Sequence, residues 1–374
     1  MQDSKPHYEL LDGLRGVAAL LVIFYHIGEG FAASPIDQCV NHGYLAVDFF
    51  YILSGFVIGY AYDDRWQKSL TVGSFFKRRL IRLHPMVIMG ALLGAVSFCI
   101  QGCREWDGTE VPFRLVLLAL ALNLFLIPAV PGTAMDVRGN NEMYSLNGPS
   151  WSLFFEYIGN ILYALFIRKL STRWLSVLTC AAGTGLAAFA IGNFSGFGHL
   201  GVGWSLAGNN FAGGFLRLMF SFSAGLLLSR IFRPARIRGA FWICSIAIAI
   251  LLALPHFGGE ESPWLNGLYE SICTILIFPA IVYLGAGGKT TDGTTSRICR
   301  FLGEISYPVY IVHYPVMYLF YAWLWSGSEK IPFSQAWPVA AGAVAVSILL
   351  AWLCLKLYDM PVRKWLAARL LPKK

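Results

Sequence analysis

Three ionisable residues, Asp12, Arg15 and His26, interrupt an otherwise apolar segment near the start of the chain. Arg15 and His26 are 11 residues apart, about three turns of an α-helix, so their side chains share one face about 16 Å apart along the axis. Asp12 falls on that face, within about 60° of Arg15. Histidine can act as a general base near neutral pH, and arginine binds anions. The stripe predicts a functional site; a structural Asp12–Arg15 pair with His26 at the membrane interface is the alternative.

A basic stretch supplies a second set of candidates, with Lys77, Arg78, Arg79 and Arg82 placing four cations within six residues. Arg79 and Arg82 are spaced i, i+3, so they share a helix face and suit the clamping of phosphates. The alternative is a cluster that orients the chain and contacts anionic lipid headgroups. We expect the three arginines to bind an anionic donor together with Arg15, because both segments approach the same side of the membrane.

Two carboxylates are candidates for partners of His26. Asp48 lies inside the second apolar segment, and Glu156 lies about one and a half to two turns into the fourth. Both are expected near the outer side, where either could orient the imidazole and fix its tautomer. A lone glutamate at that depth needs a partner, for which His26 and Arg217 are the candidates.

The ninth apolar segment contains Pro308 and Pro315, which predict a kinked or interrupted helix. Ser306 and His313 are seven residues apart and share a face. We expect Ser306, Tyr307 and His313 to support the site. His313 is expected to be a polar group that is satisfied beside the broken helix, and to matter less to catalysis than His26.

The composition shows what must position these residues. The 374 residues are 56% hydrophobic and 13% charged, with a mean hydropathy of +0.58, whereas soluble domains carry about 25% charged residues. Soluble globular and disordered classes are thereby excluded. The apolar runs have the length of helices rather than of barrel strands, so the fold class is an all-α polytopic membrane protein.

The chain has a net charge of +8, and its positive residues lie between the apolar runs. This distribution predicts contact with membrane lipids rather than nucleic acid. The eight cysteines show no metal-ligand spacing, so no metal is expected.

Ten apolar runs are long enough to cross about 30 Å of hydrocarbon. They are 8–28, 43–62, 84–101, 151–169, 174–192, 211–231, 240–257, 268–286, 305–325 and 337–358. An eleventh run, 113–128, has only 16 residues. If it does not cross, the loops on one side carry 22 Lys and Arg residues and those on the other side carry three. The positive-inside rule then places both termini in the cytoplasm and predicts that 113–128 is re-entrant or lies at the outer surface.

No inter-helix segment is long enough to hold a separate soluble domain. The sequence therefore predicts a single transmembrane domain over 1–374, with a core of about 8–363 and no appended soluble domain.

The motifs together resemble those of the membrane-bound acyltransferase family 3. The resemblance rests on Leu10-Leu-Asp-Gly-Leu-Arg-Gly-Val-Ala-Ala with His26, on Ala46-Val-Asp-Phe-Phe-Tyr-Ile-Leu-Ser-Gly-Phe, on Phe76-Lys-Arg-Arg-Leu-Ile-Arg with Pro85, on Trp151-Ser-Leu-Phe-Phe-Glu, and on Ser306-Tyr-Pro-Val-Tyr-Ile-Val-His. The motifs follow the family order. Two positions depart from the family pattern: Glu156 stands alone where two adjacent acids are common, and His84 stands where tyrosine is common.

The resemblance implies an enzyme of the bacterial inner membrane that moves an acyl group, often acetyl, from cytosolic acyl-CoA to a hydroxyl of a glycan or glycolipid. Acyl-CoA would be a co-substrate, with no bound cofactor. In this interpretation His26 is the general base, and the arginines bind the donor. The alternative is a proton-coupled secondary transporter, because intramembrane Asp, Glu, His and Arg residues also serve carriers. Only the ninth segment is interrupted by two prolines, whereas carriers commonly show matching broken helices in two halves, and this favours the enzyme.

Overall fold

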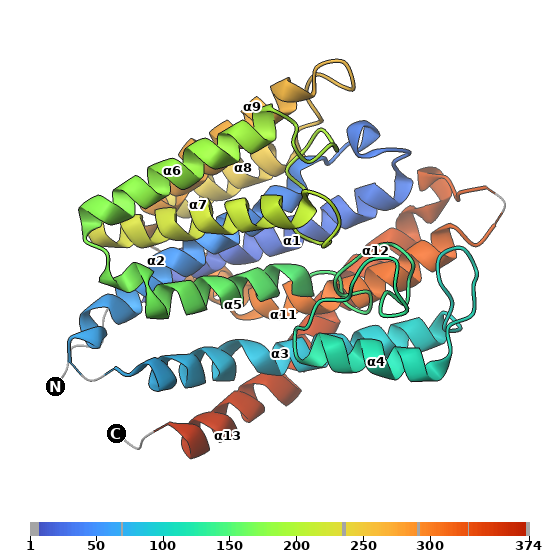
Figure 1. The fold of residues 1–374 in the computed structure, drawn as a ribbon, viewed down its shortest axis with the longest axis horizontal. Coiled ribbons are helices and arrows are strands. Elements are labelled where there is room, and N and C mark those ends of the chain that lie inside the picture. Colours follow the sequence, from blue (N-terminus) through green and yellow to red (C-terminus); the bar gives the residue numbers. More distant parts are fainter. Residues whose placement is uncertain (1–6, 69, 234–236, 290–291, 328, 372–374) are drawn as a thin grey trace.

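The computed structural model describes residues 7–68, 70–233, 237–289, 292–327 and 329–371. These residues form a bundle of helices without named strands (Figure 1). The α-helices are α1 (Glu9–Phe31), α2 (Ala46–Trp66), α3 (Val72–Ile100), α4 (Phe113–Leu124), α5 (Ser150–Leu165), α6 (Thr172–Ile191), α7 (Asn210–Ile231), α8 (Ala240–Ala253), α9 (Pro263–Ile272), α10 (Phe278–Gly287), α11 (Gly293–Leu324), α12 (Phe333–Leu353) and α13 (Met360–Leu370).

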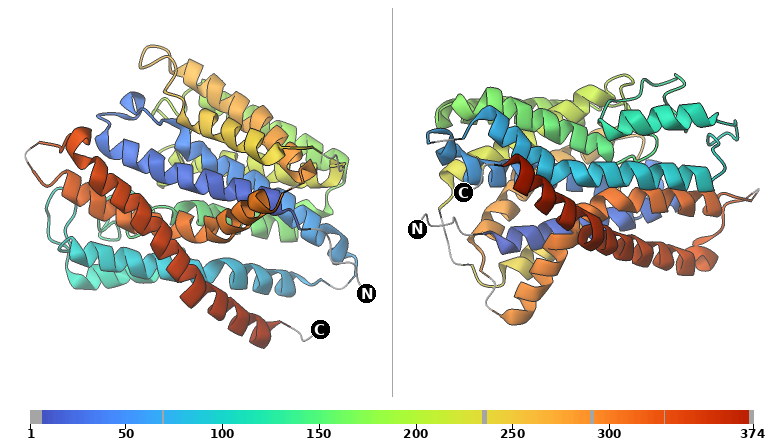
Figure 2. Two further views of the ribbon diagram at one scale, coloured as in Figure 1. Left: turned by 180° about the vertical axis from the view of Figure 1, so that it is seen from behind. Right: turned by 90° about the horizontal axis from the view of Figure 1, so that it is seen from below.

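Short π-helical and 3-10 segments complete the helical elements. Cys273–Ile277 joins α9 to α10, and Cys354–Asp359 joins α12 to α13, so each pair forms one continuous rod. Figure 2 shows the α12–α13 rod crossing the bundle obliquely. The 3-10 turns are Pro35–Asp37, His42–Leu45 and Ile167–Lys169.

Eight helical segments of the described chain are long and apolar enough to cross a membrane. They are Glu9–Phe31, His42–Trp66, Val72–Ile100, Ser150–Lys169, Thr172–Ile191, Asn210–Ile231, Pro263–Gly287 and Phe333–Leu370. The two other predicted spans correspond to α8, which has 14 residues, and to α11, which has 32. The predicted class, an all-α polytopic membrane protein, is confirmed.

Two helices begin a dozen residues before the predicted spans because capped, charged turns precede their apolar cores. The side chain of Thr71 accepts a hydrogen bond from the amide of Ser74, and α3 then runs through the basic stretch and through Pro85. The carboxylate of Asp292 caps α11 in the same way, by accepting from the amide of Thr295 (2.7 Å). Such caps satisfy amides that lack an intrahelical partner. The basic stretch is therefore helical, which is the condition under which Arg79 and Arg82 share a face.

The segment 113–128 does not form a spanning helix. Its helix α4 has 12 residues, about 18 Å, and packs beside α3 (Figure 1). The chain on either side of α4 meets at one end of α3, where Arg138 donates to the side-chain oxygen of Gln101 (2.8 Å). The chain then enters the interior of the bundle before α5 begins. Tyr51 in α2 donates to the carbonyl of Ser152 (3.0 Å), which places the first turn of α5 well below the end of the bundle.

Glycines bring two helix pairs into backbone contact. A Cβ at Gly16 of α1 would lie 2.4 Å from the carbonyl oxygen of Leu302 in α11, and one at Gly55 of α2 would lie 2.1 Å from that of Phe222 in α7. Small residues permit such close approach between membrane helices.

The placement of α4 generates a topology test. Thr109 precedes α4 and Ala134 follows it, and both are exposed. Because the segments around them meet at one end of α3, we expect Thr109→Cys and Ala134→Cys to react from outside intact cells with a membrane-impermeant maleimide. Lys68→Cys, between α2 and α3, should react only after permeabilisation. The background would lack the cysteines that are exposed or half-exposed, which are Cys39, Cys99, Cys103 and Cys180. Labelling of the first two positions from opposite sides would mean that 113–128 crosses the membrane.

Candidate functional site

A cavity of about 1070 Å³ opens between α1, α2, α3, α5, α11 and α13. Charged side chains surround its mouth, and apolar and tyrosine side chains line its inner end. His7, next to the start of the described chain, and Lys364, close to its end, both line the mouth. The two ends of the described chain therefore lie on the same side of the bundle, as predicted for the termini, which themselves lie outside the described residues.

Arg15 is held at the cavity wall by three contacts. Its guanidinium pairs with Asp12 (2.9 Å), and it donates to the hydroxyl of Ser306 (2.8 Å) and to the carbonyl of Gly303 (3.3 Å). The predicted Asp12–Arg15 pair is thus present, and Ser306 supports Arg15 from α11. Because all three partners line the cavity, the pair faces an open space rather than lipid.

Glu156 lies in this cavity and not beside His26. Its carboxylate accepts hydrogen bonds from Arg79 (2.6 Å) and from the hydroxyl of Ser54 (2.9 Å). The prediction that Glu156 orients His26 or pairs with Arg217 is therefore wrong. The sequence argument assumed that the helix starts at the outer surface, but α5 begins deeper in the bundle, so Glu156 reaches the charged mouth.

Arg82 is an unpaired cation within the described part of the chain. Its side chain is exposed and lines the cavity together with Arg15, Arg79 and Arg363. No described residue forms a hydrogen bond or ion pair with it, whereas Arg363 pairs with Asp359 (3.0 Å). A guanidinium with five free donors among other cations is a natural site for an anion.

Arg78 departs from the predicted donor set, because it is not among the residues that line the cavity. Arg78 is spaced i, i+4 from Arg82, about 40° apart around the helix, so it lies beside the face that presents Arg79 and Arg82 without reaching the cavity. Tyr307 does line the cavity, and its hydroxyl donates to the carbonyl of Leu83 (2.7 Å). This bond ties α11 to α3 and supports the wall, as expected of Tyr307.

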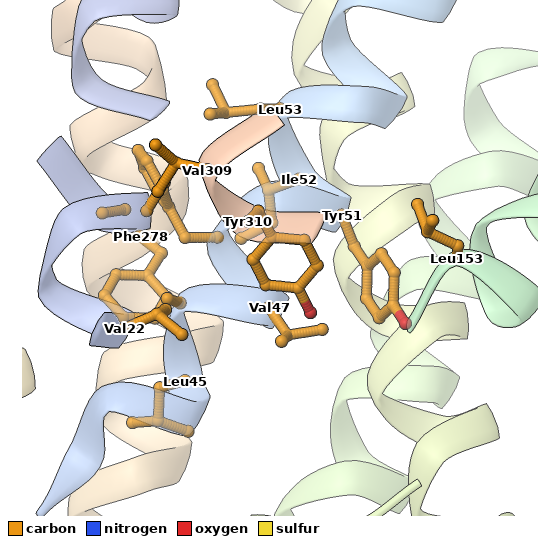
Figure 3. Close-up of a cluster of buried hydrophobic side chains, with 14 of the residues drawn as sticks. Val22, Leu45, Val47, Tyr51, Ile52, Leu53, Leu153, Phe278, Val309 and Tyr310 are labelled. Carbon is orange, nitrogen blue, oxygen red and sulfur yellow. The ribbon is translucent and has the colours of Figure 1, made fainter. Parts of the chain in front are cut away.

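The inner end of the cavity is closed by aromatic side chains. Tyr310 and the hydroxyl of Ser152 form a hydrogen bond (2.7 Å), and Tyr51 donates to the carbonyl of the same serine. Figure 3 shows the rings of Tyr51 and Tyr310 in one cluster of buried side chains, with Val47 near the Tyr310 hydroxyl.

His26 lies beyond this end and is paired with Glu29, a residue that sequence reasoning missed. Nδ1 of His26 donates to Oε2 of Glu29 (2.7 Å), and Tyr321 donates to the same carboxylate (3.1 Å). A carboxylate accepts only, so Nδ1 carries the hydrogen and Nε2 keeps a lone pair. The side chain of His26 is 16% exposed and that of Glu29 is 43% exposed, so solvent reaches the pair. The i, i+3 spacing of His26 and Glu29 on one helix was the available signal.

His313 separates His26 from the cavity. Its ring stacks on that of His26, with centroids 5.4 Å apart, and lies 6.1 Å from the ring of Tyr310. Nδ1 of His313 donates to the carbonyl of Val309 (3.0 Å), and its buried Nε2 has no partner among the described residues. The expectation that His313 is fully satisfied therefore holds for only one of its nitrogens.

Asp48 does not approach His26. It accepts hydrogen bonds from both ends of the Arg217 guanidinium (3.1 and 2.7 Å), and both side chains are fully buried. Arg217 also donates to the carbonyls of Val202 and Tyr44 (both 2.7 Å). The role predicted for Asp48 as a partner of the catalytic base is wrong, because α2 and α7 run side by side and bring Arg217 to it. The pair is structural.

The segment between α4 and α5 adds ionisable groups near the outer end of α11. Glu142 accepts a hydrogen bond from the hydroxyl of Tyr318, and Arg138 lies over the ring of the same tyrosine, 3.6 Å from its centroid. Burial raises the pKa of the Glu142 carboxyl to about 7. Sequence reasoning missed both residues, since the loop gave no periodicity to place them. Among the described residues no group of three His, Cys, Asp or Glu side chains could hold a metal.

Comparisons with known proteins identify relatives along nearly the whole chain. Residues 8–356 match the family model described as an acyltransferase domain. The chain is 28% identical to acyltransferase MdmB of Streptomyces mycarofaciens over 91% of this chain and 86% of that protein. It is 36% identical to protein 2 in the picA locus of Rhizobium radiobacter, over 44% of this chain and 85% of that protein. It is 22% identical to peptidoglycan O-acetyltransferase OatA of Listeria monocytogenes, over 96% of this chain and 56% of that protein. No solved structure matches significantly.

The Asp48–Arg217 pair generates a stability prediction. Asp48→Asn leaves a buried guanidinium without its counter-ion, a change that typically costs about 3–5 kcal/mol. We expect a large fall in the thermal unfolding temperature of the detergent-purified protein. Glu110→Gln, which removes a carboxylate from the exposed Arg104–Glu110 pair (2.7 Å), is the matched control and should leave that temperature unchanged. An Asp48→Asn protein as stable as wild type would show that the pair does not hold α2 to α7.

Proposed function

Because this chain belongs to the acyltransferase family whose domain it matches over residues 8–356, as its motifs predicted, we propose that it transfers an acyl group from cytosolic acyl-CoA to a hydroxyl of a glycan or glycolipid. Membership of the family makes the chain a membrane O-acyltransferase and decides against the transporter alternative. The donor, the acceptor and the residues that act on them are the proposal. One observation carries it: a single cavity joins an unpaired arginine at a cationic mouth to an apolar inner end.

The cavity suits a donor with a phosphorylated nucleotide at one end and a thioester at the other. Arg82 offers free donors at the mouth, and Arg15, Arg79, Arg363 and Lys364 add positive charge around it. Charge-assisted bonds from guanidinium groups to phosphate are among the strongest hydrogen bonds in proteins. A volume of about 1070 Å³ lies at the upper end of small-molecule sites, which is consistent with a ligand of the size of a coenzyme thioester.

His26 is proposed as the general base for the acceptor hydroxyl. Its Nε2 would take the hydroxyl proton while the oxygen attacks the thioester carbonyl. The C–O bond forms, the C–S bond breaks, and the coenzyme thiolate leaves and recovers the proton. Glu29, bonded to Nδ1, would hold the tautomer and stabilise the imidazolium, as a carboxylate does in the serine protease triad.

His26 and the inner end of the cavity are separated by the rings of Tyr310 and His313. Acyl transfer to a hydroxyl at His26 therefore requires one of these side chains to change its rotamer, so that the thioester and the hydroxyl meet. The free Nε2 of His313 faces no protein donor in the described residues, and a hydroxyl or amide group of a substrate would satisfy it during that passage.

The acceptor class is proposed from the relatives and from the position of His26. The Listeria relative is named for O-acetylation of peptidoglycan, a glycan, and His26 lies at the end of the bundle opposite the cationic mouth. With the mouth on the cytoplasmic side, as the Lys and Arg distribution predicts, His26 faces the outer side of the bacterial inner membrane. Nascent glycans and lipid-linked sugars on that side would present hydroxyls to it.

The His26–Glu29 pair gives the first activity prediction. A positioned general base is worth roughly 10²–10⁴ in rate, so His26→Gln should abolish transfer of label from [14C]acetyl-CoA into the glycan fraction of membranes. The same protein should still bind acetyl-CoA. Glu29→Gln should give a smaller loss, and His313→Gln should also retain more activity than His26→Gln. Near wild-type transfer by His26→Gln would remove the general-base assignment.

The unpaired side chain of Arg82 gives the second prediction, which concerns donor binding. Arg82→Ala should weaken acetyl-CoA binding to the purified protein about 10- to 100-fold, the range expected for loss of one or two charged hydrogen bonds. Arg82→Lys should restore part of this affinity, because a point charge cannot make a bidentate contact. Lys77→Ala is the control, since Lys77 is exposed on the same helix but does not line the cavity. Equal affinities of wild type and the three variants for acetyl-CoA would show that the arginine cluster does not bind the donor and serves only to orient the chain in the membrane.

A further inference from the structure

The inner end of the cavity has a defined shape. Val47, Phe50 and Tyr51 reach it from α2, Leu153 from α5 and Tyr310 from α11. Four of these side chains are buried, and Phe50 is half-buried because one side of its ring borders the cavity. Figure 3 shows Val47, Leu153 and the two tyrosine rings close together in one cluster.

Three contacts hold this end wall in its closed position. Tyr310 and the hydroxyl of Ser152 share a hydrogen bond (2.7 Å), and Tyr51 donates to the carbonyl of Ser152 (3.0 Å). The rings of Phe50 and Tyr310 pack edge to face, with centroids 5.3 Å apart and an interplanar angle of 80°. Two hydrogen bonds and an aromatic contact thus fix the end wall from α2, α5 and α11, and moving the Tyr310 ring breaks at least one of them.

Buried side chains lie behind the wall. Val309 and His313 are completely buried on the same helix, and Tyr310 packs 6.1 Å from the ring of His313. With the ring of Tyr310 in this position, a group that enters from the mouth ends at Phe50 and Tyr310. Protein interiors are close-packed, so an extra methylene at such a wall has to displace side chains.

We propose that Phe50 and Tyr310 form a stop that limits the donor to short acyl groups. This inference rests on the proposed function, in which the acyl end of the coenzyme thioester lies at the inner end of the cavity. The stop is made by ring bulk. The Tyr310 hydroxyl only holds the ring in place, so Phe50, which has no polar atom, is the residue whose truncation enlarges the end.

The test uses the full-length detergent-purified protein and displacement of [14C]acetyl-CoA by unlabelled acetyl-, propionyl-, butyryl- and hexanoyl-CoA. One methylene in an apolar pocket changes discrimination about 10- to 200-fold. Wild type should bind butyryl-CoA at least about tenfold more weakly than acetyl-CoA, and hexanoyl-CoA more weakly still. Phe50→Ala should bind butyryl-CoA as well as acetyl-CoA or better. Tyr310→Phe keeps the ring and its contact with Phe50 but loses the hydrogen bond to Ser152, so it should keep the preference for acetyl-CoA by a smaller factor.

The control is Phe113→Ala, which removes the same ring from an exposed position on α4 (62% exposed) and should leave the chain-length profile unchanged. Equal binding of all four thioesters by wild type would overturn the stop, and so would a Phe50→Ala protein with the wild-type profile. Absence of any acetyl-CoA binding would instead contradict the proposed function itself. If Phe50→Ala does not fold, Phe50→Leu, which keeps an apolar side chain, should shift the profile in the same direction by a smaller factor.

Discussion

The contact between α1 and α11 is the constraint on which the site depends. The two helices run side by side with no side chain between them at Gly16, where the backbone of Leu302 fills the space. This register places Arg15 against Ser306 at one end (2.8 Å) and the ring of His26 on that of His313 at the other (5.4 Å). Because a helix is stiff over its three turns between Arg15 and His26, one interface positions both the donor-side cation and the proposed base. A side chain at Gly16 would force the helices apart and disturb both ends at once.

The arginines inside the bundle differ in whether they contact protein acceptors or the open cavity. Arg217 is completely buried and has a carboxylate and two carbonyl groups as partners, so its charge is neutralised within the protein. Arg79 has Glu156 as its partner. Arg82 has no partner among the described residues and is exposed to the cavity, where water or a ligand can solvate it. An unpaired cation is tolerable in a membrane protein only beside such a space, and this difference separates Arg217, which holds the fold, from Arg82, which is free to bind an anion.

The sequence correctly predicted the features that depend on composition, on the length of the apolar runs and on spacing within one helix. The shared face of Arg79 and Arg82, and the Asp12–Arg15 pair that was the structural alternative, follow from spacing within one helix. The fold class follows from composition and the length of the apolar runs, and the expectation that 113–128 does not span follows from its short length and the distribution of Lys and Arg. The partners of Glu156 and Asp48 were wrong because they depend on the depth at which a helix starts and on which helix lies beside it. Glu29 is spaced i, i+3 from His26 on the same helix, but the predicted partners of His26 were Asp48 and Glu156, which are carboxylates of other helices. Arg363 approaches the cavity from the far end of the chain, a contact that local pattern does not encode.

In the proposed function, the wall between the cavity and His26 has to satisfy two opposing requirements. A passage open from the cationic mouth to the outer end would let water and ions cross the membrane and would expose a thioester to hydrolysis. A permanently closed wall would prevent the acyl group from reaching a hydroxyl. Tyr310 and His313 meet both requirements with few bonds: the Tyr310 ring is held by one side-chain hydrogen bond to Ser152, and His313 by one bond to its own helix. Breaking one such bond costs about 1 kcal/mol net, so the barrier can open for a bound substrate and close again without rearranging the helices.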